Sequence, residues 1–156
     1  MQVSRRTPTV STLSADWIKN VQDYASFKPV RWEKTIEVSI VTLDELIDQC
    51  GCPDFCKIDV EGFEAEVLHG LRHPIRLLSF EYIAGELRSL ETCLGRLAEL
   101  GNYDYNWSMG EQMRLANLRW AGGEGAWKSL SRLEAGAGPV DIYARLQDLE
   151  VPAASI

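Results

Sequence analysis

The order of the predicted elements indicates an α/β protein with a parallel sheet and an antiparallel closing strand pair. A short apolar strand at 55–60 runs directly into residues 61–70, whose apolar positions have helical spacing. A second, nearly continuous apolar run at 75–83 is typical of a strand buried on both faces, and a helical leucine pattern at 87–100 follows it. Two successive strand-to-helix units of this kind favour parallel strands.

Two helices and two strands are predicted before these units. A serine N-cap precedes a short amphipathic helix at 14–24. A capping-box pattern, Thr42 with Glu45, precedes a second helix at 43–49. The strands are expected where β-branched or alternating apolar residues occur, at 8–12 and 36–41.

The C-terminal region contains the closing strands. Glycines between residues 122 and 125 predict a flexible turn, and one or two helical turns follow at 126–133. The tail at 147–156 is expected to fray. Three strands are expected, of which the first and last form the closing pair: 103–107, 113–120 and 140–146.

Length, composition and charge indicate a single acidic domain. The chain has 156 residues, of which 46% are hydrophobic, enough to build one core. Its formal net charge of -7 argues against binding to nucleic acid. No apolar run approaches the ~20 residues that cross a bilayer, and the N-terminus has no apolar signal segment. We therefore expect a cytoplasmic protein without a membrane partner.

Three of the four cysteines, Cys50, Cys52 and Cys56, fall within seven residues. A structural zinc site usually has two pairs of Cys or His ligands with a short gap in each pair, and this pattern is incomplete here. Reduced structural thiols and no metal are expected. A small zinc-binding domain built on these three cysteines is the alternative.

Two carboxylates, Asp59 and Glu61, stand where the strand at 55–60 passes into its helix. Ligands of α/β sheets bind outside the carboxyl ends of strands, so these residues are candidates for chemistry. Asp59 could instead be a helix N-cap. Glu61 could be a general base or a first-turn acid favoured by the helix dipole. Lys57, inside the apolar strand, is expected to pair with Asp59 or Glu81. Two further acids are expected on the solvated face of the helix: Glu64 and Glu66.

Four motifs define a family pattern: VTLDELI at 41–47, KIDVEGFEAEVLHGL at 57–71, LSFEYI at 78–83 and DIYARL at 141–146. Their combination resembles the FkbM family of S-adenosylmethionine-dependent methyltransferases. The resemblance implies a class I, Rossmann-like sheet in the order 3-2-1-4-5-7-6, with an antiparallel seventh strand. It assigns the segments as follows: 8–12 and 36–41 to an insertion, 55–60 to the fourth strand, 76–82 to the fifth, and 103–107 with 140–146 to the closing pair.

The resemblance also implies S-adenosylmethionine as cofactor and methyl transfer to a hydroxyl of a sugar or natural product. Asp59 and Glu61 would be catalytic, and Asp59 and Gly62 would contact the cofactor. Three further residues would line the acceptor pocket: Glu81, Tyr82 and Trp107. For the two aromatic residues among them, core packing is the alternative role.

One part of the family pattern is missing, because no glycine-rich turn precedes Thr35. We interpret 35–146 as the C-terminal part of a methyltransferase domain and 1–34 as part of an insertion, with weak or no independent activity and cofactor binding. The strand at 55–60 would then be a sheet edge that favours self-association. A non-catalytic interaction module that pairs through this edge is the alternative function.

Overall fold

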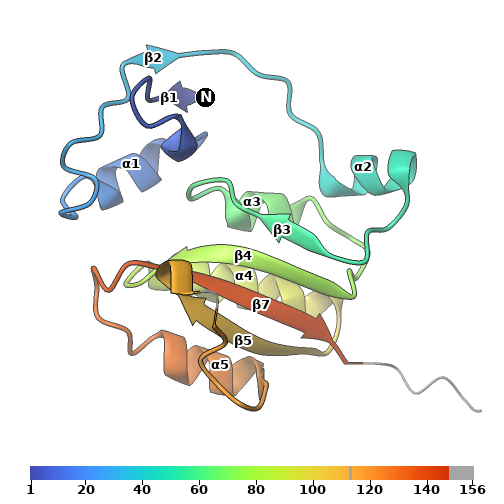
Figure 1. Ribbon diagram of the computed structural model, residues 1–156. Coiled ribbons are helices and arrows are strands. Elements are labelled where there is room, and N and C mark those ends of the chain that lie inside the picture. Colours follow the sequence, from blue (N-terminus) through green and yellow to red (C-terminus); the bar gives the residue numbers. More distant parts are fainter. Residues whose placement is uncertain (113, 148–156) are drawn as a thin grey trace, which may run out of the picture.

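A computed structural model describes residues 1–112 and 114–147, and its main element is a five-stranded mixed sheet (Figure 1). The strands are β3 (Cys56–Ile58), β4 (Leu77–Ile83), β5 (Tyr103–Met109), β6 (Ala121–Gly122) and β7 (Pro139–Leu146). They follow the order β3-β4-β7-β5-β6. β3 and β4 are parallel, whereas β7 is antiparallel to β4 and to β5. The predicted α/β class and the antiparallel closing pair are confirmed.

Three helices lie against this sheet, and α4 lies behind it in Figure 1. They are α3 (Glu64–His69), α4 (Leu87–Leu100) and α5 (Gly123–Leu130). α4 matches its prediction, since its leucine stripe, Leu90, Leu94 and Leu97, is buried. Gly101 follows its end, where an added Cβ would lie 2.7 Å from Leu146 Cδ1. A side chain at this position would therefore require the end of the Leu146 side chain to move.

The core lies between the helices and one face of the sheet. Alternate residues of β4 and β7 are at most 2% exposed: Leu78, Phe80, Tyr82, Val140, Ile142 and Ala144. The intervening residues, Ser79 and Glu81 of β4 and Asp141 and Tyr143 of β7, point to the other face. This alternation gives the sheet one apolar face and one polar face.

The first 35 residues form a smaller unit beside the main sheet. Its elements are β1 (Gln2–Val3), the 3-10 helix η1 (Pro8–Val10), α1 (Ala15–Val21) and β2 (Lys34–Thr35). Ser14 is the predicted N-cap of α1, and its hydroxyl accepts from the Trp17 N–H at 3.1 Å. The Trp17 ring packs edge-to-face against Phe27 and Trp32. This cluster includes Ile83 of β4, which seats the unit against the sheet.

The strand predicted at 8–12 is wrong. Pro8 begins η1 instead, because proline has no N–H for a strand ladder but suits the first positions of a helix. Thr12 makes an isolated antiparallel bridge to Gln2.

The strand predicted at 36–41 is also wrong. The β1–β2 pairing extends to Ile36, whose N–H and C=O bond to Met1. No strand of the described residues pairs with the segment that follows. Its apolar residues are exposed at 41% for Val38, 66% for Ile40 and 54% for Val41. Alternation alone does not make a strand when no neighbouring strand accepts its hydrogen bonds.

α2 (Leu43–Cys50) begins with the predicted capping box. Thr42 Oγ1 accepts from the Glu45 N–H at 3.2 Å, and the Glu45 carboxylate accepts from the Thr42 N–H at 2.7 Å. Asp44 is buried and accepts from the backbone N–H and the guanidinium of Arg72. These bonds lower the pKa of Asp44 to about 2 and tie α2 to the segment after α3.

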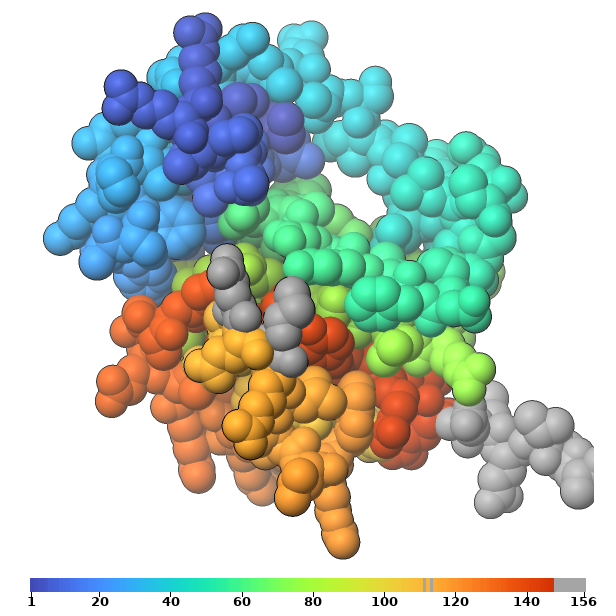
Figure 2. Space-filling view, viewed as in Figure 1, coloured from blue at the N-terminus to red at the C-terminus, as the bar shows by residue number. Residues whose placement is uncertain are grey.

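An apolar groove separates residues 38–43 from the outer edge of β3. Figure 2 shows the opening between these segments, drawn in cyan and green. Phe55, just before β3, is 45% exposed. None of the described strands pairs with β3 on this side, so the predicted open sheet edge is confirmed within residues 1–112 and 114–147.

The described part of 113–120, a predicted strand, contains no strand. Ala116 donates its N–H to Trp107 O at 2.7 Å, and the Asn106 side chain bonds to the Asn117 backbone. These bonds fold the segment as a loop over β5, after the single-turn helix η2 (Gly110–Gln112). The glycines predicted as a flexible turn instead begin α5, with Gly122 at its N-cap.

The C-terminal tail was predicted to fray from residue 147. Gln147 is held by its N–H on Asn102 O at 2.8 Å and by its side chain on Asp104 at 2.7 Å. Residues 148–156 lie outside the described residues. Within the part of the chain that the structure covers, no helix has the length and apolar character of a membrane span.

Candidate functional site

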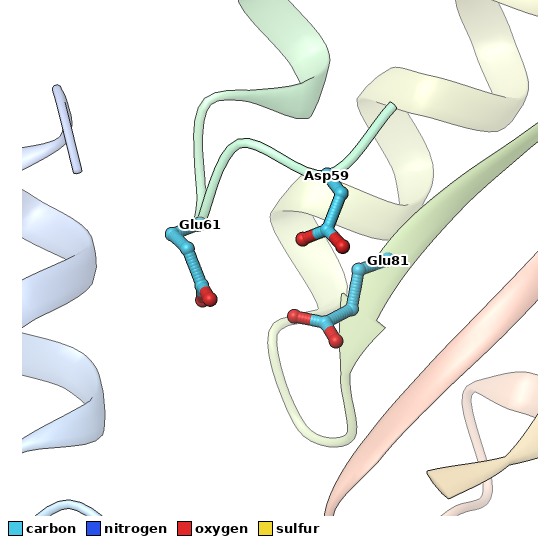
Figure 3. A group of neighbouring side chains, drawn as sticks. All are labelled: Asp59, Glu61 and Glu81. Carbon is cyan, nitrogen blue, oxygen red and sulfur yellow. The ribbon is translucent and has the colours of Figure 1, made fainter. Parts of the chain in front are cut away.

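Three carboxylates converge at the carboxyl ends of two parallel strands. Asp59 directly follows β3, Glu61 lies in the turn beyond it, and Glu81 belongs to β4. The register pairs Ile58 with Phe80, which places Asp59 level with Glu81 on the polar face. Each residue offers one carboxylate oxygen, and these three oxygens lie within 4.8 Å of one another. Figure 3 shows the three side chains as neighbours. The structure therefore brings together three of the predicted site residues.

The turn that carries Glu61 has an unusual backbone. Glu61 has a φ of 53° and Gly62 a φ of 83°, both in the left-handed region. α3 begins after Phe63, its N-cap, so Asp59 is not the N-cap and Glu61 is not in the first helical turn. Both helix-terminus alternatives considered for these two acids are therefore wrong.

Glu64 holds this turn from the helix side. Its side chain is buried, and its Oε1 accepts from the Gly62 N–H at 3.1 Å and the Val60 N–H at 3.4 Å. The prediction of a solvated Glu64 is therefore wrong, whereas Glu66 is exposed as expected. The sequence signal that could have predicted this role is the position of Glu64 at the start of the helix, because an acid there can accept from the free N–H groups of the preceding turn.

Burial and mutual repulsion make two of these carboxyls hard to ionise. Partial burial, and then the charges of Glu81 and Asp59, raise the pKa of Glu61 to about 8. Burial and the charge of Asp59 raise the pKa of Glu81 to about 7. The cluster can therefore hold and release protons near neutral pH.

Lys57 supplies the positive charge beside the cluster. Its Nζ lies 3.2 Å from Asp59 Oδ2, so the predicted ion pair is confirmed, and 3.7 Å from Asp141 Oδ1 of β7. The hydrogen bond to Asp59 raises the pKa of Lys57. Asp141 was not predicted as part of the site, because its position beside β3 and β4 depends on where β7 enters the sheet.

Two cavities meet at Glu81. One, of about 680 Å³, lies on the polar face and is lined by Lys57, Asp59, Ser79, Asp141 and Tyr143 among others. The other, of about 370 Å³, lies between α1 and the start of α4, and its lining includes Gly62 and Trp17. The shared carboxylate gives a ligand in either cavity access to the acidic cluster.

Three other predicted site residues have structural roles in this arrangement. Tyr82 and Trp107 belong to the core on the helix-covered face, opposite Glu81, and the Tyr82 hydroxyl accepts from the Gly85 N–H. The structure thus does not bring them to the cluster. Gly62 packs directly against the Trp17 ring, which explains its lack of a side chain. Its contact with the cofactor stays a prediction.

A model of the FkbM methyltransferase domain matches residues 7–106, more than half of the chain. The chain belongs to the FkbM methyltransferase family. No curated protein and no solved structure matches it. The match spans β3, β4 and the acidic turn between β3 and α3, so the carboxylate cluster lies inside the family domain.

The three carboxylates of the cluster also form a candidate metal site in this FkbM chain. No metal was expected, yet the oxygens of Asp59, Glu61 and Glu81 are close enough to hold a hard divalent cation. The zinc alternative is not supported, because Cys50, Cys52 and Cys56 are not part of any three-ligand group among the described residues. Cys50 and Cys52 are exposed free thiols.

S-adenosylmethionine fits the described residues only in part. Class I methyltransferases hold its methionine end on a glycine-rich turn that follows a strand. The first glycine of this sequence is Gly51, and β3 has no strand on its outer side within the described residues. The described residues provide carboxylates but no such glycine-rich cradle.

Proposed function

We propose that this chain forms the acceptor-binding and proton-accepting part of an S-adenosylmethionine-dependent O-methyltransferase. The observation that carries the proposal is the convergence of Asp59, Glu61 and Glu81 at the ends of β3 and β4. Membership of the FkbM family supports methyl transfer as the reaction. The order β3-β4-β7-β5 agrees with the 4-5-7-6 half of the expected class I sheet.

A hydroxyl acceptor suits the chemistry of the site. A base near an acceptor O–H must release and take up a proton near neutral pH, and a pKa of about 8 places Glu61 in that range. Asp59, held by Lys57, would orient the hydroxyl. Polar groups of Ser79, Asp141 and Tyr143 line the adjacent cavity and would hydrogen-bond a polyhydroxylated acceptor such as a sugar. The bound cofactor would supply the methyl group.

Cofactor binding by the chain alone should be weak, because the glycine-rich turn is absent from its sequence. Calorimetric titration with S-adenosylhomocysteine should give no saturation at micromolar concentrations, a range that corresponds to about 8 kcal/mol of binding free energy. Micromolar binding would contradict this part of the proposal and would point to a complete site formed in some other way.

The activity itself can be tested with labelled S-adenosylmethionine at millimolar concentration and polyhydroxylated acceptors. Replacing Glu61→Gln should lower the rate by about 100-fold or more, the usual contribution of a general base. Glu91→Gln on the exposed surface of α4 is the matched control and should keep the wild-type rate. Equal rates for Glu61→Gln and wild type would remove Glu61 as the base and contradict the proton-accepting role.

A second candidate function is an interaction module that pairs through the free edge of β3. The open edge and its exposed apolar groove favour it. The occupant best suited to this edge is a second copy of the chain. In an antiparallel pairing centred on Ile58, Lys57 of each copy lies directly opposite Asp59 of the other, so two opposite-charge pairs form. Light scattering distinguishes this dimer from a monomer.

A further inference from the structure

We propose that Thr12 is a positioning residue for Glu61, holding the turn after β3 in the conformation that aims this carboxylate into the cluster. The inference rests on the proposed function, in which Glu61 accepts the proton. Thr12 lies 49 positions earlier in the chain, in the N-terminal unit that adds no strand to the main sheet.

Thr12 is held rigidly by its own contacts. It is 1% exposed. Its backbone N–H and C=O bond to Gln2 at 2.9 and 2.7 Å. Its hydroxyl accepts from the Ser14 N–H at 2.8 Å, which leaves its proton to donate to the Glu61 carbonyl at 2.6 Å. The position of the hydroxyl is therefore fixed by contacts other than its bond to the turn.

The peptide group between Glu61 and Gly62 is held at both ends. Thr12 binds its C=O, and the buried carboxylate of Glu64 binds its N–H at 3.1 Å. The Trp17 side chain packs against Gly62, where an added Cβ would lie 2.2 Å from the ring. These three contacts leave the peptide plane little freedom to rotate.

This grip matters because Glu61 is a residue with a Cβ at a φ of 53°, a conformation that side chains disfavour. Without a bond to its carbonyl, Glu61 would rotate about its N–Cα bond toward the extended or right-handed region. This rotation moves Cβ together with the carbonyl group, so the carboxylate would move away from Asp59 and Glu81. Thr12 thus acts on the chemistry through backbone geometry, without touching the acceptor.

The test compares wild type with two variants. Thr12→Val keeps the shape of the side chain but loses the hydroxyl, and Thr12→Ser keeps the hydroxyl. Thr35→Val, an exposed threonine of the same unit, is the matched control. NMR reports the φ of Glu61 from its HN–Hα coupling, and hydrogen exchange reports the Gly62 amide. We expect Thr12→Val to change the coupling and to speed Gly62 exchange by about tenfold or more. Thr12→Ser and Thr35→Val should match wild type.

Amide protection in β4 and β7 separates positioning from general stability and should stay unchanged in all variants. If Thr12→Val does not fold, Thr12→Ala removes the same bond with less bulk. An unchanged Glu61 coupling in Thr12→Val, a Thr12→Ser variant that does not restore it, or loss of protection across β4 and β7 would each overturn the inference. These readouts do not depend on methyl transfer. The rate of Glu61→Gln tests the proposed function separately, so failure of the function and failure of this inference are distinguishable.

Discussion

At the scale of single residues, the turn after β3 depends on Gly62. Its φ of 83° suits glycine, and an added Cβ would lie 2.2 Å from the Trp17 ring. We expect Gly62→Ala to lower the free energy of unfolding by about 2–4 kcal/mol, from backbone strain and overpacking together. Urea denaturation measures this loss.

The control for this substitution is Gly95→Ala. Gly95 lies inside α4 with no atom within 4 Å of an added Cβ. Alanine should raise the stability there by about 0.5–1 kcal/mol, because glycine weakens helix interiors. If both variants changed stability by the same amount, tight packing at Gly62 would not be the cause.

The raised pKa of Glu61 predicts a dependence of stability on pH. A carboxyl whose pKa is about 8 in the folded protein and 4.5 when unperturbed binds its proton more tightly in the folded state. Its contribution is therefore complete below about pH 4.5 and is lost as the pH rises through 8. Because the group is partly solvated, we expect wild type to lose about 1–2 kcal/mol more than Glu61→Gln between pH 5 and 8.

Urea denaturation of both proteins across this pH range measures the difference. Parallel curves of unfolding free energy against pH for wild type and Glu61→Gln would show that the pKa of Glu61 is not raised in the folded protein. The same perturbation predicts that methyl transfer, if measured, increases with pH up to about 8, because a base must be deprotonated to accept a proton.

At the scale of elements, α2 depends on its capping box. Thr42→Ala removes the oxygen that accepts from the Glu45 N–H and should cost about 1 kcal/mol. For a chain of this size, that loss lowers Tm by roughly 2–4 °C. Thr42→Ser keeps the cap and should stay close to wild type in a thermal melt. An equal loss in both variants would assign the effect to the threonine methyl group, which lies near Gly70.

Sequence patterns predicted those elements whose signals are local. α1, α2 and α4 were expected from their caps and apolar stripes, and each forms close to the expected bounds. The strand predicted at 36–41 and the described part of the one predicted at 113–120 are wrong. Strand formation requires a neighbouring strand, which alternation in one segment cannot reveal. The extent of α5 was underestimated, since its two glycines, Gly123 and Gly125, weaken a helical pattern that packing against β5 and α4 nevertheless stabilises.

At the scale of the whole molecule, the free edge of β3 predicts self-association. Lys57→Glu or Asp59→Lys places like charges opposite each other in both symmetric pairs, so each should weaken the dimer by about tenfold. The double variant restores opposite charges and should recover dimerisation. Light scattering over a concentration series measures this. A wild-type chain that stays monomeric, or single variants that associate as wild type does, would contradict the pairing.

The sequence by itself determined the family, the α/β class, the main helices and the two acids after β3. These are local properties, carried by apolar periodicity, capping residues and the KIDVEG motif. The tertiary structure decided which distant groups share the site. Glu81 and Asp141 reach it through the strand order, and Thr12, Trp17 and Glu64 hold its turn through contacts and burial. Such contacts depend on how strands and segments pack in space, and residue spacing along the chain does not encode that packing directly.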